Sequence, residues 1–234
     1  RTVRSVLLGK RPAEQASDKR TEDSLFVYYH GIRPGEYEIR AAYSGKLRRP
    51  RKEPFLYACP QPAVQDSTTR GDWPGRYGSK GYVFCHYEPD GSHRIRLPEF
   101  TDSIRFAKTG GLHIATRTDD RRAPVSEDGS GTRNAGTVVT LDPAPCNQTM
   151  TVDIRNKHDG PYRLALYFVD WEKTGRRSAV EVFDLDDKRL LMPVQIVRDY
   201  REGRYVVLSL EGSVRLRINQ VRGTNASLCA LFFD

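Results

Sequence analysis

Short runs in which apolar and polar residues alternate recur roughly every ten residues from residue 26 to the end of the chain. A period of two places successive side chains on opposite faces of a β-strand, and no stretch shows the i, i+3, i+4 apolar spacing of an amphipathic helix. In residues 150–155, Val152 and Ile154 are expected to face the core while Asp153 and Arg155 face solvent. The pattern therefore predicts an all-β chain in which at least one sheet face is wet.

Twelve strands are expected between residues 83 and 233, over the ranges 83–87, 93–97, 104–109, 112–118, 137–141, 150–155, 162–171, 179–185, 194–200, 204–210, 214–221 and 228–233. Dipeptides typical of tight turns separate several of them, at Asp90-Gly91, Gly110-Gly111, Asp159-Gly160, Glu202-Gly203 and Glu211-Gly212. Many short strands joined by such turns are typical of an antiparallel β-sandwich.

The N-terminal part of the chain has a different character. Two alternating runs, 26–29 and 37–43, flank Arg33-Pro34-Gly35-Glu36, and a Pro-Gly turn between such runs predicts a β-hairpin. Four prolines then fall within residues 46–62, which favours a linker because proline cannot donate into a sheet. We therefore expect residues 1–62 to hold a polar segment, a hairpin and a linker, or the tail of a neighbouring domain, and 63–234 to form the sandwich.

The formal net charge of +8 raises the question of an anionic partner. The densest basic cluster, residues 46–52, lies in the expected linker, and other arginines alternate with apolar residues near carboxylates. No nucleic-acid recognition motif accompanies them, so we expect no nucleic-acid partner. No apolar run is long enough to cross a membrane. The chain starts at Arg1 without a signal-peptide core, so we expect it to be processed or excised from something longer.

Motifs that would identify an enzyme are absent from the sequence. It contains no nucleophile elbow, no zinc-protease helix, no Walker loop and no dinucleotide fingerprint. Cys59, Cys85, Cys146 and Cys229 are too widely spaced for a zinc ribbon or a redox pair, and both bridged and free thiols stay open. Cys229 sits in an apolar run, as a buried thiol would. A pair of hydrolytic carboxylates is defined by separation in space, so catalysis stays open, although we do not favour it.

The glycine-rich segment 66–82 contains Trp73, Tyr77 and Tyr82. Glycines allow tight turns, and exposed aromatic rings offer flat faces to the apolar side of a sugar. These three residues are therefore candidate sugar ligands. The alternative is that Trp73 and Tyr82 are buried side chains at the end of the hydrophobic core.

A second candidate group follows the longest apolar strand, where Asp170, Trp171 and Arg176 lie close together in the sequence. An indole beside a carboxylate and a guanidinium is a common way to hold a sugar ring, because the planar arginine fork can bridge hydroxyls or a carboxylate. The alternative is an ordinary turn with surface charges. Arg133, in the Gly/Ser-rich loop 122–136, is a further candidate ligand.

Three separated motifs carry a resemblance to a known family. The T-x-G-x-W-x-G-x-Y-G-x-x-G-Y pattern of residues 69–82, the strand 162–171 and the closing segment 223–234 resemble accessory modules of bacterial glycoside hydrolases and polysaccharide-degrading proteins, of the galactose-binding-like and malectin-like jelly-roll type. The resemblance implies a β-jelly-roll, a carbohydrate ligand, a secreted or cell-surface location and a structural calcium. Acidic stretches at 119–120, 127–128 and 184–187 could supply calcium ligands, but none has the spacing of a calcium loop.

The sequence therefore favours a non-catalytic carbohydrate-binding module that supports a catalytic domain, a glycoside hydrolase or polysaccharide lyase, on a neutral or anionic polysaccharide. Two alternatives stay open. One is a structural sandwich that buttresses the catalytic domain without binding sugar. The other is a small enzyme that acts on an acidic polysaccharide, with arginines that neutralise uronate or sulfate groups.

Overall fold

The computed structural model describes residues 2–8, 11–12, 15–20, 25–29, 39–44, 63–141 and 148–234. The chain separates into two compact units, Arg1–Pro54 and Phe55–Asp234. The boundary expected near residue 62 and the whole of the expected linker, residues 46–62, fall outside the described residues. Within the described ranges, no helix is long and apolar enough to span a membrane.

The N-terminal unit contains short antiparallel strands, and their pairing differs from the hairpin expected between 26–29 and 37–43. β4 (Leu25–Tyr29) pairs with β3 (Gln15–Arg20), whereas β5 (Ile39–Ser44) pairs with β1 (Thr2–Leu8), which also pairs with β2 (Arg11–Pro12). A hairpin-like pair is therefore present, but β3 and β4 form it. The sequence of β3, QASDKR, has Ala16 as its one apolar residue, so its apolar and polar residues do not alternate and the pattern did not predict this strand.

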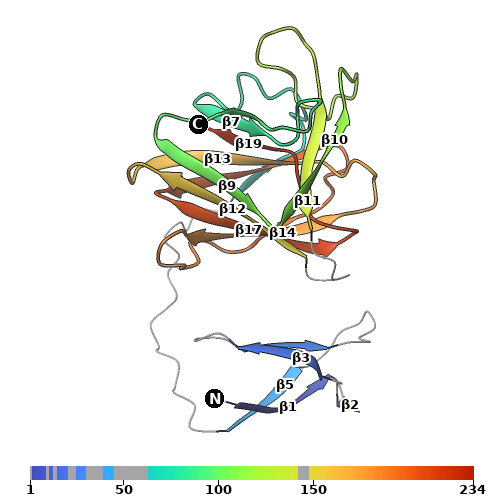
Figure 1. Cartoon of the computed structure of the whole chain (residues 1–234), viewed down its shortest axis with the longest axis vertical. Helices are drawn as coiled ribbons and strands as arrows, with labels where there is room; N and C mark the ends of the chain where they lie inside the picture. The colour runs from blue at the N-terminus through green and yellow to red at the C-terminus, as the bar shows by residue number, and fades with distance from the viewer. Residues whose placement is uncertain are drawn as a thin grey trace. The chain divides into compact units, whose positions relative to one another are not determined.

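The C-terminal unit is a β-sandwich, which confirms the expected fold class (Figure 1). Each of the twelve expected strand ranges overlaps a strand of the structure. Among the described residues, one sheet has the order β15-β14-β17-β12-β9, a second has the order β6-β16-β13-β19-β7-β8, and a third has the order β10-β11-β18, with all neighbours antiparallel. The strands are β6 (Val64–Asp66), β7 (Gly81–Phe84), β8 (Arg94–Arg96), β9 (Thr101–Ala107), β10 (Thr109–Ala115), β11 (Ala135–Thr140), β12 (Thr149–Asn156), β13 (Pro161–Phe168), β14 (Arg177–Asp184), β15 (Gln195–Val197), β16 (Arg204–Glu211), β17 (Val214–Arg222), β18 (Ser227–Leu228) and β19 (Ala230–Phe233).

The inner core packs between the five-stranded sheet that contains β12 and the six-stranded sheet that contains β13. Val152 and Ile154 are completely buried in it, whereas Asp153 is half-buried and Arg155 is exposed, so the predicted alternation of β12 is confirmed. On β17, Val214, Leu216 and Ile218 are likewise buried, and the arginines between them are not. One face of the five-stranded sheet thus remains open to solvent.

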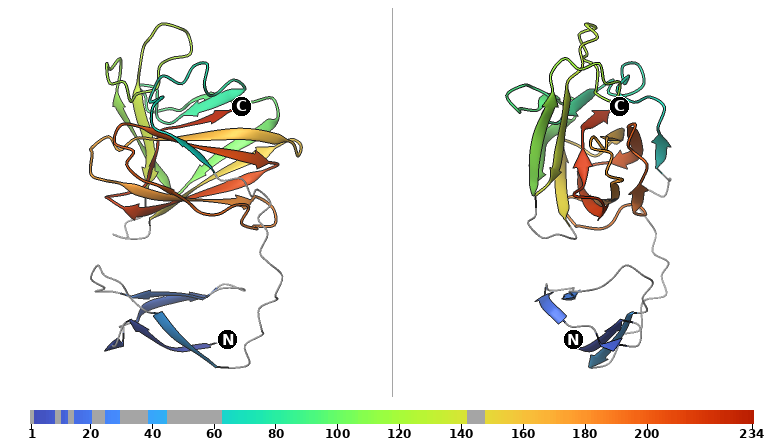
Figure 2. Two further views of the ribbon diagram at one scale, coloured as in Figure 1. Left: turned by 180° about the vertical axis from the view of Figure 1, so that it is seen from behind. Right: turned by 90° about the vertical axis from the view of Figure 1, so that its right-hand side faces the viewer.

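The second face of the six-stranded sheet also carries a hydrophobic cluster, here called the outer cluster. Side chains of β7, β13, β16 and β19 alternate between the inner core and this outer cluster, as Leu164 and Ala165 do on β13. Two segments without regular strands, 67–80 and 116–134, lie side by side and form a loop cover over it (Figure 2, teal and yellow-green). The Gly71 amide donates to Arg121 O at 2.9 Å, and the Val125 amide donates to Gly71 O at 3.1 Å.

The prediction of a turn at Gly110-Gly111 was wrong, because both residues lie inside β10. The bend between β9 and β10 falls at Lys108 instead, which has a φ of 58°. Gly111 is required for a different reason. A Cβ at this position would lie 1.6 Å from Nε2 of His86, so the glycine makes room for that imidazole against the strand.

Cys85, directly after β7, and Cys229, between β18 and β19, are buried free thiols, and the Cys85 amide donates to Cys229 O at 2.9 Å. The prediction of a buried thiol at Cys229 is therefore confirmed. Its pKa rises to about 11 because burial disfavours the thiolate. Cys59 and Cys146 lie outside the described residues.

Candidate functional site

Trp73, the first sequence-predicted sugar ligand, is a member of the outer cluster and only 4% exposed. Its ring centroid lies 5.4 Å from that of Tyr82, 5.6 Å from Phe84 and 5.2 Å from Phe232. Its indole N–H donates to the carbonyl of Val125 at 2.7 Å, which ties the two halves of the loop cover together. These contacts are those of a core residue.

Tyr77 and Tyr82 belong to the same aromatic group. Tyr82 is buried and stacks on Phe84 at 4.4 Å between ring centroids. Tyr77 is half-buried, stacks on Tyr205 at 4.4 Å, and its hydroxyl donates to Asp66 Oδ2 at 2.9 Å. Burial raises the pKa of Tyr77, and the hydrogen bond to Asp66 raises it further, so this phenol stays protonated.

Asp170 and Arg176 are brought together as a buried ion pair, with side chains 1% and 4% exposed. Arg176 Nη1 donates to Asp170 Oδ1 at 2.6 Å, and the amides of Gly175 and Arg176 donate to Asp170 Oδ2 at 2.7 and 3.1 Å. Burial raises the pKa of Asp170, but these hydrogen bonds outweigh it and hold the pKa below its usual value. The pair closes the loop that follows β13.

Trp171 and Arg133 are the other two sequence-predicted ligands. Trp171 is half-buried against the outer cluster, and the guanidinium carbon of Arg122 lies 5.0 Å from its ring centroid. Arg133 donates to the carbonyl of Ala123 at 2.9 Å and pairs closely with Asp72. The four aromatic residues predicted as sugar ligands thus all belong to or pack against the outer cluster, and Arg133 holds the loop cover in place through its contacts with Ala123 and Asp72. Their roles as sugar ligands stay a prediction.

The acidic stretches considered for calcium are engaged in other contacts. Both carboxylate oxygens of Asp120 accept hydrogen bonds from Arg122, and Asp184 accepts the amides of Asp186 and Asp187. In the part of the chain that the structure describes, no group of three His, Cys, Asp or Glu side chains could hold a metal ion. The structural calcium that the resemblance implies therefore has no cluster of three carboxylates to bind it among the described residues.

Three histidines meet where β10 passes the loop after β7. His93 Nδ1 accepts the His86 amide at 2.9 Å, and the two rings lie 4.6 Å apart. His113 Nδ1 lies 3.1 Å from the carbonyl oxygen of His86. Burial lowers the pKa of His93 below 6.5, and His86 lowers it further.

The pKa of His93 predicts a pH-dependent stability. Because the folded state binds this proton more weakly than the unfolded state, the His93 contribution is complete above pH 6.5 and is lost as the pH falls through the folded-state pKa. A His93→Gln variant keeps an acceptor for the His86 amide but does not titrate. We expect urea unfolding across this pH range to show a flatter dependence for the variant, and equal slopes would contradict the assignment.

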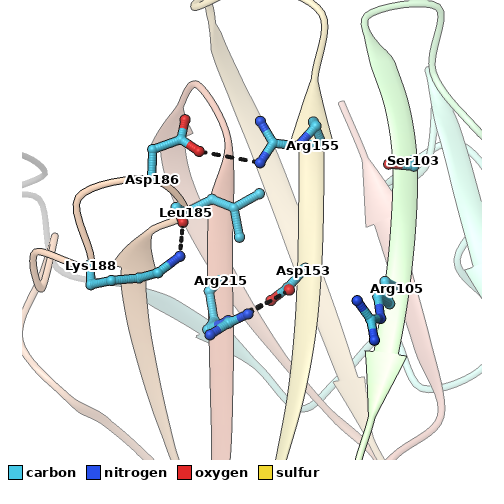
Figure 3. A pocket seen from close by; sticks show the side chains of 8 residues that line it. All are labelled: Ser103, Arg105, Asp153, Arg155, Leu185, Asp186, Lys188 and Arg215. Carbon is cyan, nitrogen blue, oxygen red and sulfur yellow. Dashed lines mark hydrogen bonds and ion pairs between the residues drawn. The ribbon is translucent and has the colours of Figure 1, made fainter.

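The open face of the five-stranded sheet holds a hollow of about 370 Å³, here called the sheet-face hollow (Figure 3). β9, β12 and β17 of the sheet and the loop after β14 supply the residues that line it. Its lining consists of Ser103, Arg105, Asp153, Arg155, Leu185, Asp186, Lys188 and Arg215. None of these residues was predicted from the sequence as a sugar ligand, and only Asp186 had been considered, as a calcium ligand.

The centre of the hollow is a carboxylate among cations. Arg215 donates to Asp153 through Nε at 2.6 Å and through Nη2 at 2.7 Å, in a bidentate pair. These hydrogen bonds lower the pKa of Asp153, and the charges of Lys188 and Arg105 lower it further. Arg155 contacts Asp186 at 3.2 Å on the rim. The hollow thus contains planar donors and acceptors held on rigid strands.

The polar surface continues along the same sheet beyond the hollow. Arg217 forms a second bidentate pair with Glu181, at 2.6 and 2.8 Å, and Asn219 donates to the same carboxylate at 2.6 Å. The guanidinium carbon of Arg217 lies 4.9 Å from the centroid of the Phe183 ring. Successive rows of the sheet therefore present planar charged pairs beside an aromatic ring.

The comparisons with known proteins give matches among solved structures alone. No family model and no curated protein matches the chain. The chain is similar to two family 32 carbohydrate-binding modules of Clostridium perfringens ZmpB in complex with GalNAc, with 11% identity and a TM-score of 0.41 over 77% of this chain and 41% of that chain.

Two further similar structures are single modules. One is a family 35 carbohydrate-binding module from Clostridium thermocellum, with 10% identity, a TM-score of 0.30 and coverage of 56% of this chain and 98% of that one. The other is a module of Cellvibrio mixtus lichenase 5A in complex with cellotriose, with 9% identity, a TM-score of 0.34 and coverage of 66% and 96%.

Proposed function

We propose that the chain is a carbohydrate-binding module that holds a catalytic domain, a glycoside hydrolase or polysaccharide lyase, near its polysaccharide outside the cell. The observation that carries the proposal is the sheet-face hollow, a preformed polar depression on an otherwise open sheet. A module of this kind adds no chemistry. It raises the effective concentration of polymer at the attached domain.

The side chains of the hollow suit sugar hydroxyls because they are already fixed by their own pairing. Arg215 uses Nε and Nη2 on Asp153, and within the described residues its Nη1 group makes no hydrogen bond, so donors remain for a ligand. Groups that are ordered before binding cost less conformational entropy when the ligand arrives. Placement on β12 and β17 makes their spacing rigid.

The first test is retention of the chain in native gels that contain soluble polysaccharides. We expect retention by at least one polymer, and a weaker retention when Asp153→Asn and Arg215→Gln are combined. Loss of a charge-assisted hydrogen bond corresponds to about tenfold or more in affinity. The matched control neutralises the Glu88–Arg94 pair, which has a contact of 2.5 Å outside the hollow, and is expected to bind like the wild type.

The same assay separates the proposal from its alternatives. If the Asp153/Arg215 variant and the Glu88/Arg94 control variant lose retention equally, the hollow is not the binding site. The Trp171→Ala variant would then test whether sugar binds at Trp171, whose ring lies beside the guanidinium of Arg122. Absence of retention by every polymer, together with a less stable catalytic domain after deletion of the module, would favour a buttressing role. Cleavage of polymer by the isolated chain would overturn a non-catalytic role.

A further inference from the structure

We infer that the sheet-face hollow selects saccharides that carry an acidic group, a uronate carboxylate or a sulfate, and that Arg105 contacts this group. The inference rests on the proposed function and names the ligand class of the same hollow. It starts from an imbalance of charge. Four cationic and two anionic side chains line the hollow, so the lining carries a formal excess of two positive charges.

The two carboxylates of the hollow already have partners. Both oxygens of Asp153 are engaged by Arg215. Asp186 is 72% exposed on the rim and is paired with Arg155. The positive charges of Arg105 and Lys188 are therefore not matched by a carboxylate contact within the hollow. Lys188 Nζ donates to the backbone carbonyl of Leu185, which fixes its position but does not neutralise it.

Arg105 is distinguished from its neighbours on the sheet by its pairing. The register places Arg105 of β9 beside Asp153 of β12, which in turn lies beside Arg215 of β17. In the described part of the chain the Arg105 guanidinium makes no hydrogen bond or ion pair, although its charge acts on Asp153. Arg217, two residues along β17, is by contrast held in a bidentate ion pair with Glu181. This row of neighbouring side chains on the sheet therefore ends at Arg105, whose guanidinium is available to bind a ligand.

The chemistry of this cation favours an oxyanion over a hydroxyl. Neighbouring strands lie about 4.8 Å apart, so Arg105 and Asp153 are adjacent across the sheet floor. A guanidinium presents a planar fork that matches carboxylate and sulfate oxygens in a bidentate contact. An acidic sugar in the hollow would meet Arg105 on one wall and Lys188 on the opposite wall, with the Asp153–Arg215 pair beneath it (Figure 3).

The experiment compares matched polymers that differ only in their acidic groups. Dextran is paired with dextran sulfate, and polygalacturonate is paired with its methyl ester, with affinities for the full chain measured by titration calorimetry or retention in gels. We expect tighter binding of at least one acidic member, and its identity separates sulfate from carboxylate. Arg105→Gln is expected to weaken acidic binding about tenfold or more and to leave binding of the neutral member unchanged.

The control is Arg198→Gln, which removes the charge of an exposed arginine outside the hollow. Unfolding curves for both variants should match the wild type, since neither side chain is buried. Equal binding of acidic and neutral members, or equal losses in the two variants, would overturn the inference while the proposed function stands. Failure to bind any of a wider panel of glycans would overturn the proposed function itself.

Discussion

Trp73→Ala will lower the free energy of unfolding by about 3–5 kcal/mol, the range found for removal of a large buried aromatic side chain. The indole fills the space between the loop cover and the outer face of the six-stranded sheet, in contact with Tyr82, Phe84 and Phe232. Alanine would leave a cavity there and an unpaired carbonyl at Val125. Urea unfolding monitored by tyrosine fluorescence and circular dichroism measures the loss.

Trp73→Phe is the matched control, because it keeps a ring in the cluster and removes only the hydrogen bond to Val125 and part of the volume. We expect a cost of about 1–3 kcal/mol, from the unsatisfied buried acceptor. Sugar stacking on Trp73 makes the opposite prediction for the alanine variant, namely normal stability with loss of glycan retention. That result would overrule the assignment of Trp73 to the core.

The strands of the sandwich could be predicted because burial of one face of a strand produces a regular alternation of apolar and polar residues in its sequence. Val152 and Ile154 alternate with Asp153 and Arg155 because β12 has the core on one side and water on the other. The residues of the outer cluster show a less specific sequence pattern. Trp73, Tyr77 and Tyr82 lie among glycines, and the same composition suits exposed sugar-stacking rings and a loop that packs closely on a sheet. Only the tertiary structure shows that these rings pack against the six-stranded sheet.

The sheet-face hollow could not be predicted for a topological reason. The alternation of residues 150–155 indicated that Asp153 faces outward, but it meets Arg215 because β12 and β17 are neighbours in the sheet. Arg105 and Lys188 come to the same place through β9 and the loop after β14, although they are far apart in the sequence. Local patterns give the face of a strand but not its partner or register, as the pairing of β4 with β3 also shows.

Arg176→Met will also cost about 3–5 kcal/mol, because it leaves the buried Asp170 carboxylate without its counter-charge. Methionine keeps the length and apolar volume of the arginine stem, so the loss comes from the charge of Arg176 and from its hydrogen bonds to Asp170, Glu172, Asn225 and Thr224. Asp170 would retain the amides of Gly175 and Arg176 as donors, but without the guanidinium its pKa would rise relative to the wild type. The matched control is Arg177→Met, which changes an exposed neighbour and is expected to cost less than about 0.5 kcal/mol.

The electrostatic origin of this loss gives a second, independent signature. In the Arg176→Met variant the lone carboxylate is relieved when it binds a proton, so the deficit relative to the wild type should shrink as the pH falls. Combining Arg176→Met with Asp170→Asn removes both charges, and the double variant should cost less than the sum of the two single changes. Additive costs with a deficit independent of pH would show that packing, and not the ion pair, holds the loop after β13.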